Sequence, residues 1–361
     1  MAFTFRRDMR RRHGRRAPSW LDRHGSRAQT RSTQRRPTMI RRRRVMQAGV
    51  AVAAAVSGPA FGQQSGQPIR LVVPYGPGGS TDTAGRLLAE RMSADLGKSV
   101  IVENKPGGGT MVGMQAVANA RPDGTTLLLT TTTAALLPAF DVPLPVDPQK
   151  ALTAVAQFAD IPVFLGVRTS HPAKTLAEFT AWLKEQPATV PYGTSSSGGL
   201  PHLWGELLNL KLGRKLEHIP YKAAAEALRD VVAGHVPAFV DVTTPVDQQV
   251  RAGTMRGLIV GAPKRVAAVP DVPTAAELGM PDLEAAVYFG VTAPAGTPAE
   301  IIATYNAAIN SALKVDAVRE RLQSLGYIPT GGPAQAYAER LASETVRWRK
   351  VIKEAGIQPP A

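Results

Sequence analysis

The sequence contains no cysteine among its 361 residues. This absence excludes disulfide bonds, thiolate metal sites and a lipid-modified cysteine anchor. Several catalytic signatures are missing as well. The glycine-rich segment 76–82 has no lysine after its glycines, no H-E-x-x-H occurs, and Ser196 and His202 do not lie in a G-x-S-x-G turn. A hydrolase or a transferase is therefore a poor interpretation.

The charge is distributed very unevenly along the chain. Lysine and arginine number 43 against 28 acidic residues, a formal net charge of +15. Residues 1–62 hold 16 arginines, no lysine and two aspartates, whereas the remaining 299 residues hold 27 basic and 26 acidic side chains. The long C-terminal part is thus nearly neutral, which argues against a nucleic-acid partner.

The N-terminal segment has the pattern of a signal peptide. Four arginines, 41–44, precede an apolar stretch at 45–56, and Ala60-Phe61-Gly62 supplies small residues for cleavage before Gln63. The apolar stretch is shorter than the ~20 residues of a membrane span. Both Sec and twin-arginine export fit the arginines, and either delivers the protein to the periplasm. Residues 1–38 exceed what export needs, so Met39 is the expected start.

The exported protein is expected to begin near Gln63. N-terminal sequencing of periplasmic protein from the native host checks this expectation. Recovery of residues 1–38 on the exported chain would contradict both the start site and the cleavage site.

The rest of the chain alternates strand-like and helix-like segments. Apolar runs at 69–73, 100–102 and 127–129 are separated by helical patterns, the first of which should end at Gly97. A second such unit begins near 163–167. This order predicts parallel sheets covered by helices, with ligands bound beyond the carboxyl ends of the strands.

Glycine and hydroxyl residues follow several of these strands. They occur at 76–80, 106–109 and 130–133, and "YGTSSSGGLPHLWGELL" at 192–208 repeats the strand, glycine loop and helix. Glycine lets backbone N–H groups approach an anion, and a helix N-terminus favours one. A Cβ at Gly79 or Gly198 should block that approach or force the loop out of a positive φ.

Each of these features has a structural alternative. The glycines could form tight turns, the threonines a strand end, and Asp82 a favourable start of a helix. His202 and Glu206 could bind a metal, but a structural hydrogen bond is the better interpretation because further ligands are lacking nearby.

Six segments together resemble the extracytoplasmic receptors of tripartite tricarboxylate transporters, the Bug family. They are "PIRLVVPYGPGGSTD", "VIVENKPGGG", "RPDGTTLLL", "YGTSSSGGLPHL", "HIPYKAAAEALRDVVAGHV" and "VPDVPTAAELGMPDLEAAVYFGVTAPAGTP", in order between Pro68 and about Gly356. The resemblance implies a type II periplasmic binding protein with two α/β domains, a ligand cleft between them and hinge strands. The domains would be 67–163 with 289–361, and 164–288.

The resemblance also implies a function. The receptor would be a monomer that delivers a small carboxylate to a pair of membrane permease subunits, without a metal, a cofactor or chemistry on the ligand. The implied ligand-binding residues are Gly78, Gly79, Ser80, Thr81, Asp82, Thr131, Thr132, Ser195, Ser196, Ser197, Gly198, Gly199, His202 and Asp241. Departures from the family pattern at Met111, Val112, Ala223 and Val242 leave the ligand open.

Two glycine loops without lysine or arginine suit an acid with a carboxylate at each end. Asp241, if it faces the ligand, would repel a third carboxylate and favour an amine or hydroxyl substituent. We therefore expect a dicarboxylate rather than citrate. A ligand sensor for a signalling partner is the alternative use of the same fold.

Overall fold

The computed structural model describes residues 66–213 and 216–359, and the predicted signal peptide and cleavage site lie outside these residues. The strands are Ile69–Val73 (β1), Val100–Asn104 (β2), Thr126–Thr131 (β3), Leu152–Arg168 (β4), Val190–Thr194 (β5), Leu216–Pro220 (β6), Ala238–Val242 (β7), Met255–Val260 (β8), Ala286–Pro294 (β9) and Ile328–Pro329 (β10). The α-helices are Ser80–Leu96 (α1), Met111–Ala118 (α2), Thr133–Ala139 (α3), Pro148–Ala151 (α4), Leu176–Glu185 (α5), Leu200–Leu212 (α6), Ala224–Ala233 (α7), Asp247–Arg251 (α8), Ala299–Ala312 (α9), Asp316–Ser324 (α10) and Ala334–Ala355 (α11). Short 3-10 turns occur at Gly108–Thr110 (η1) and Pro281–Leu283 (η2).

The first helix illustrates how the sequence pattern directs the structure. α1 buries Ala84, Leu88 and Met92, which recur at helical spacing against the sheet. Its C-cap is Gly97 at φ 61°, a left-handed conformation that glycine adopts without a Cβ penalty. The predicted end of this helix is confirmed. Among the described residues, no helix combines the length and apolar character that crossing a membrane requires.

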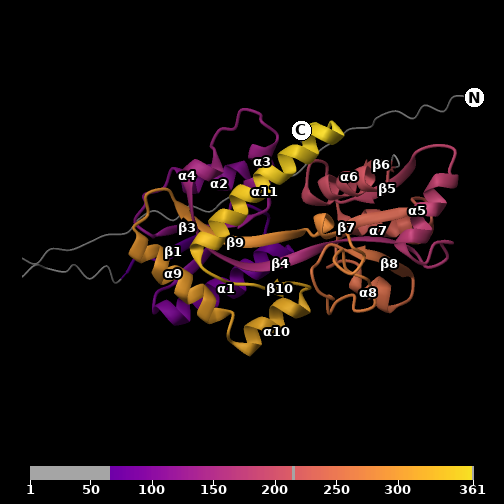
Figure 1. Ribbon diagram of the computed structural model, residues 1–361. Coiled ribbons are helices and arrows are strands. Elements are labelled where there is room, and N and C mark those ends of the chain that lie inside the picture. The colour runs from indigo at the N-terminus through magenta and orange to yellow at the C-terminus, as the bar shows by residue number, and fades with distance from the viewer. Residues whose placement is uncertain (1–65, 214–215, 360–361) are drawn as a thin grey trace, which may run out of the picture. The chain divides into compact units, whose positions relative to one another are not determined.

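The strands form two sheets that share β4 (Figure 1). In the first, β1 pairs in parallel with β2 and β3, and β9 lies antiparallel between β3 and β4. In the second, β5 pairs in parallel with β6 and β7, and β4 is antiparallel to β7 and β8. Each sheet with its helices is called a lobe below. The parallel pairs confirm the predicted alternation of strands and helices.

The register of β4 shows how the two lobes face each other. Thr131, the last residue of β3, is opposite Phe289, which in turn pairs with Ala159 of β4. Val242, the last residue of β7, pairs with Val163 of β4. The carboxyl ends of both sets of parallel strands therefore point toward one short stretch of β4. Four residues at 3.3 Å each separate these levels by about 13 Å along the strand.

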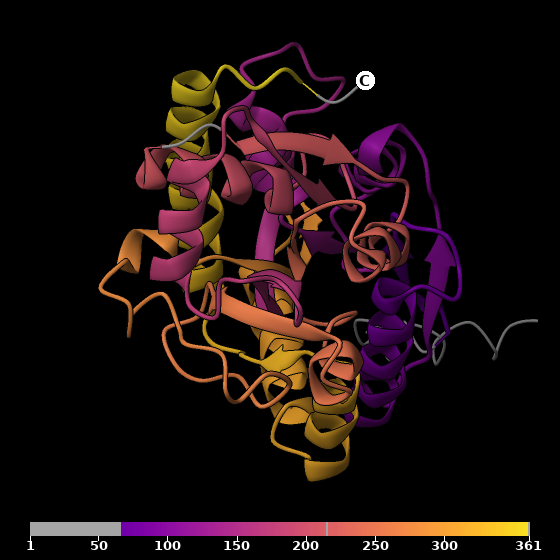
Figure 2. The same cartoon turned by 90° about the vertical axis from the view of Figure 1, so that its right-hand side faces the viewer.

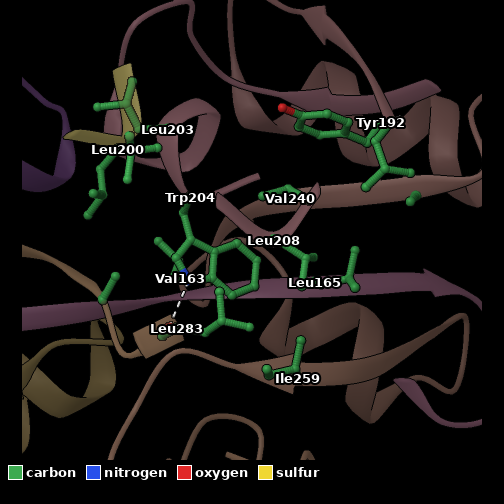
Figure 3. Close-up of a cluster of buried hydrophobic side chains, with 14 of the residues drawn as sticks. Val163, Leu165, Tyr192, Leu200, Leu203, Trp204, Leu208, Val240, Ile259 and Leu283 are labelled. Carbon is green, nitrogen blue, oxygen red and sulfur yellow. Dashed lines mark hydrogen bonds between the residues drawn. The ribbon is translucent and has the colours of Figure 1, made fainter. Parts of the chain in front are cut away.

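One of the two large apolar cores lies around Trp204 of α6 (Figure 3). Its ring packs among Val163 and Leu165 of β4 and Val240 of β7, and its Nε1 donates to the Leu283 carbonyl at 2.8 Å. The same core includes Trp348 of α11 and side chains of α3. Helix α11 contacts both α3 of the first lobe and α6 of the second (Figures 1 and 2). The C-terminal helix thus packs on both lobes.

Candidate functional site

The first-lobe loop connects the carboxyl end of β1 to α1. Gly78 has φ 85°, in the left-handed region, and Gly79 follows as an extended N-cap with φ −75° and ψ 171°. No described side chain caps this helix. The N–H groups of the first turn, which carries Ser80 and Thr81, are therefore available to an anion. The expected positive φ is wrong for Gly79, where a Cβ would lie 4.0 Å from the nearest atom, the Gly76 oxygen.

Asp82 fixes this loop from inside the protein. Its Oδ2 accepts hydrogen bonds from the Gly78 N–H at 2.9 Å and from Arg86 Nε at 2.9 Å. Its Oδ1 accepts from Arg86 at 3.0 Å and from Asn104 Nδ2 at 2.8 Å. The Arg86 hydrogen bonds outweigh burial and lower the pKa of Asp82 to about 2. A carboxylate occupied in this way positions the backbone, and its predicted contact with the ligand stays a prediction.

The second-lobe loop repeats this construction. Gly198 has φ 70°, so the expected positive φ is right here, and Gly199 is an extended N-cap of α6. The Gly198 N–H donates to Nδ1 of His202 at 3.0 Å. His202 is the third residue of α6, as Asp82 is the third residue of α1. In both lobes, a side chain of the first helical turn holds the left-handed glycine.

Asp241 fixes the start of the second-lobe loop. Asp241 is 2% exposed. Its Oδ2 accepts a hydrogen bond from the Ser195 N–H at 2.7 Å, and its Oδ1 accepts one from the Val242 N–H at 2.8 Å. Burial is the main influence on its pKa and raises it, while these hydrogen bonds lower it. Both oxygens therefore serve backbone N–H groups in this structure. Its predicted influence on the ligand's substituents stays a prediction, and the structure shows that this carboxylate also anchors the loop.

His202 stacks on a second histidine that the sequence analysis missed. The rings of His202 and His218 lie 3.7 Å apart between centroids, at 13°, and His218 Nε2 is 2.7 Å from the Thr194 hydroxyl. Burial lowers the pKa of each to about 4, and for His218 the neighbouring ring adds to this effect. Glu206 accepts from the Tyr192 hydroxyl at 2.7 Å. The residues described hold no group of three or more side chains suited to a metal.

The predicted serines and threonines lie along the same two edges. Thr131 is 3% exposed and its hydroxyl is 2.9 Å from that of Tyr75, while Thr132 is the N-cap residue of α3. Ser196 accepts a hydrogen bond at its carbonyl from Thr194, and Ser197 lines a groove beside His202. Arg86, Asn104 and His218 contact the predicted residues but were not singled out, because they come from other elements or from the far side of a helical turn.

The stacked histidines should make stability depend on pH. The ordinary histidine pKa is 6.5, so the unfolded chain binds protons at these two rings below that pH. The folded protein binds them only near pH 4. Stability present above pH 6.5 is lost as the pH falls toward 4. At about 1.4 kcal/mol per pKa unit, each ring alone would account for roughly 3 kcal/mol. Neither ring is fully buried and solvent screens their charges, so we expect a combined loss on the order of 3 kcal/mol rather than the full sum. Urea unfolding between pH 7 and 4 measures it.

A matched pair of variants assigns this pH dependence. His218→Phe keeps an aromatic ring against His202 but removes one titrating group, so its stability should fall less steeply with pH. His235→Gln changes an exposed histidine outside the stacked pair and controls for the loss of a histidine as such. Equal slopes in His218→Phe and the wild type would contradict the assignment to the stacked pair.

The lobes, the shared strand and the paired loops define a class, the periplasmic binding proteins with two α/β lobes. The solved periplasmic binding protein BugD has this fold, with a TM-score of 0.67 at 30% identity over 81% of this chain and 98% of BugD. The model of the tripartite tricarboxylate transporter family receptor matches residues 84–357. The chain belongs to this receptor family.

Two further solved structures of similar proteins contain acids. A Rhodopseudomonas palustris protein solved with adipate is 33% identical, with a TM-score of 0.69 over 81% of this chain and 98% of that one. The protein MatC from the same species, solved with bound malate, is 32% identical, with a TM-score of 0.66 over 79% and 98%. Both acids carry two carboxylates.

Proposed function

We propose that this protein is a periplasmic receptor that binds a small dicarboxylate and delivers it to the membrane subunits of a tripartite transporter. The observation that carries the proposal is the repeated loop: Gly78-Gly79 in the first lobe and Gly198-Gly199 in the second have the same backbone conformation and the same kind of internal support. Two equivalent anion sites suit two equivalent groups on one ligand.

The spacing of the lobes supports a ligand of this size. The carboxyl ends of β3 and β7, the strands that pair with the loop-bearing strands β1 and β5, differ by about 13 Å along β4. A four- to six-carbon diacid with a hydrogen bond at each end can fill a span of this size. N–H groups and helix N-termini would meet both negative charges without a salt bridge. The malate and adipate held by two similar proteins are acids of this kind.

The mechanism follows from the position of the loops on separate lobes. One carboxylate binds the first-lobe N–H groups, and closure brings the segment 195–199 to the other. Closure removes water from the ligand, which strengthens each charge-assisted hydrogen bond. The ligand thereby favours the closed conformation, and the permease recognises that form. The receptor works as a monomer and leaves the ligand chemically unchanged.

A thermal-shift panel tests the substrate class. Malate, succinate and adipate should stabilise the protein more than citrate or benzoate do, and a ligand at 100 times its Kd should add about 2.7 kcal/mol. Mass spectrometry of the denatured protein identifies any acid that co-purifies. A largest shift with citrate or with benzoate would contradict the two-ended grip, and turnover of the bound acid would contradict a receptor role.

A further inference from the structure

Thr110 has an unusual backbone conformation next to the first-lobe site. Its φ is 85°, in the left-handed region, and it follows three glycines with positive φ, 107–109. A β-branched residue is rarely found there, because its Cβ crowds the backbone. Such a conformation persists only where the surrounding structure supports it, and it is concentrated at functional sites. Thr110 is also 5% exposed.

Thr110 also does not cap the helix that it precedes, although a threonine at its position usually does. It is the N-cap residue of α2, where a threonine hydroxyl normally accepts a hydrogen bond from the second or third helical N–H. Within the described chain, Thr110 makes no such cap. Its hydroxyl instead donates to the Thr133 hydroxyl at 3.3 Å. The left-handed backbone and the missing cap both cost stability. The structure accepts both costs and in return places the Thr110 hydroxyl against that of Thr133.

The contact joins Thr110 to a chain of four hydroxyls. Thr133 and Thr131 are 2.7 Å apart at their Oγ1 atoms, and Thr131 and the Tyr75 hydroxyl are 2.9 Å apart. Thr131 is the last residue of β3, and the other three residues come from the segments that follow β2, β3 and β1, so the chain crosses the carboxyl edge of the first sheet. Four hydroxyl protons serve three hydrogen bonds. One proton is therefore left to donate outside the chain.

Tyr75 is the end of this chain closest in sequence to the first-lobe glycines. It lies three residues before Gly78, and Asn104 donates to its carbonyl at 3.0 Å while also holding Asp82. Burial raises the pKa of Tyr75, so the phenol keeps its proton. If each hydroxyl donates to the next from Thr110 onward, the proton left over belongs to Tyr75, and aligned donors strengthen one another.

We propose that Tyr75 donates this proton to a ligand carboxylate, as a ligand-binding residue, and that Thr110 is the positioning residue that orders the chain behind it. The inference rests on the proposed function, since the acceptor is the carboxylate bound by the first-lobe loop. It adds a phenol donor to the backbone N–H groups of the first-lobe loop.

Isosteric variants test the chain, with malate and adipate as probes. Thr110→Val keeps the shape and the β-branch but removes the hydroxyl, and Tyr75→Phe removes the terminal donor. Each should weaken binding by calorimetry about tenfold, the usual scale for one hydrogen bond to a charged group. Thr110→Ser keeps the hydroxyl and should bind within about twofold of the wild type. The double variant Thr110→Val with Tyr75→Phe should lose little more than the larger single loss, because one chain is broken twice.

The outcomes separate this inference from the proposed function. Thr110→Val and Tyr75→Phe variants that bind as tightly as the wild type would contradict the proposed role of the hydroxyl chain. Equal losses of affinity in Thr110→Val and Thr110→Ser would contradict it as well. Neither result would count against a dicarboxylate receptor. Failure of the wild type to bind either acid would count against the proposed substrate class. In that case crystal structures without ligand still decide the positioning role: the Thr131 hydroxyl should lie between Tyr75 and Thr133 in the wild type and turn away in Thr110→Val. An unchanged Thr131 in the variant would overturn it.

Discussion

Gly78→Val and Gly198→Val are each expected to abolish dicarboxylate binding while the protein stays folded. Both glycines have positive φ, 85° and 70°, and a β-branched residue avoids that region. The variant loop must therefore turn its N–H groups away from the ligand. We expect a loss of affinity of at least about 100-fold, or about 2.8 kcal/mol. Calorimetry with malate and adipate measures it.

A third glycine provides the control for backbone strain. Gly97, the C-cap of α1, has φ 61°, and like Gly78 it has no heavy atom within 4 Å of an added Cβ. Gly97→Val should therefore bring a comparable conformational penalty of roughly 1–3 kcal/mol but leave affinity unchanged. Binding that survives in both Gly78→Val and Gly198→Val would show that the loops are structural turns and that the site lies elsewhere.

Asp241→Asn is expected to weaken every acid to a similar degree. Asp241 accepts N–H groups on both oxygens, so an amide NH2 in its place opposes either the Ser195 or the Val242 N–H. A buried donor without a partner costs about 1–3 kcal/mol, and the Ser195 end of the second-lobe loop loses its anchor. Thermal unfolding should show the loss of stability, and calorimetry should show weaker binding of di- and tricarboxylates alike.

Asp271→Asn is the matched control, since Asp271 is exposed and should change neither quantity. A selective gain for citrate in Asp241→Asn would contradict this account. That result would instead support the expectation from sequence, in which the Asp241 charge faces the ligand and repels a third carboxylate.

The sequence predicts the elements whose determinants are local. The strand Ile69–Val73, the stop at Gly97 and the two glycine loops each depend on neighbouring residues, and each is found where expected. The shared strand β4 was harder to predict. It runs from Leu152 to Arg168, but Asp160 and Pro162 interrupt its apolar pattern, and the sequence placed the start of the second unit near residue 163.

Those two interruptions have causes outside the local sequence. Pro162 stands where β4 changes partners from β9 to β7, and there a missing N–H is tolerated. Asp160 is paired with Arg340 of α11 at 2.9 Å. Likewise, the supports of Asp82 and His202 include Asn104 and His218, which lie on other strands. The sequence shows which residues could bind an anion, but only the fold shows which ones hold the loops in place.

A crystal structure with the acid that stabilises the protein most tests the central claim directly. The account predicts one carboxylate within hydrogen-bonding distance of the N–H groups at 79–81 and the other near those of Ser197 and Gly199, with the lobes closed around the carbon chain. These groups are expected because the N–H groups of Gly78, Ser195 and Gly198 already donate within the protein. An acid with both carboxylates on one lobe, or bound away from both glycine loops, would contradict it.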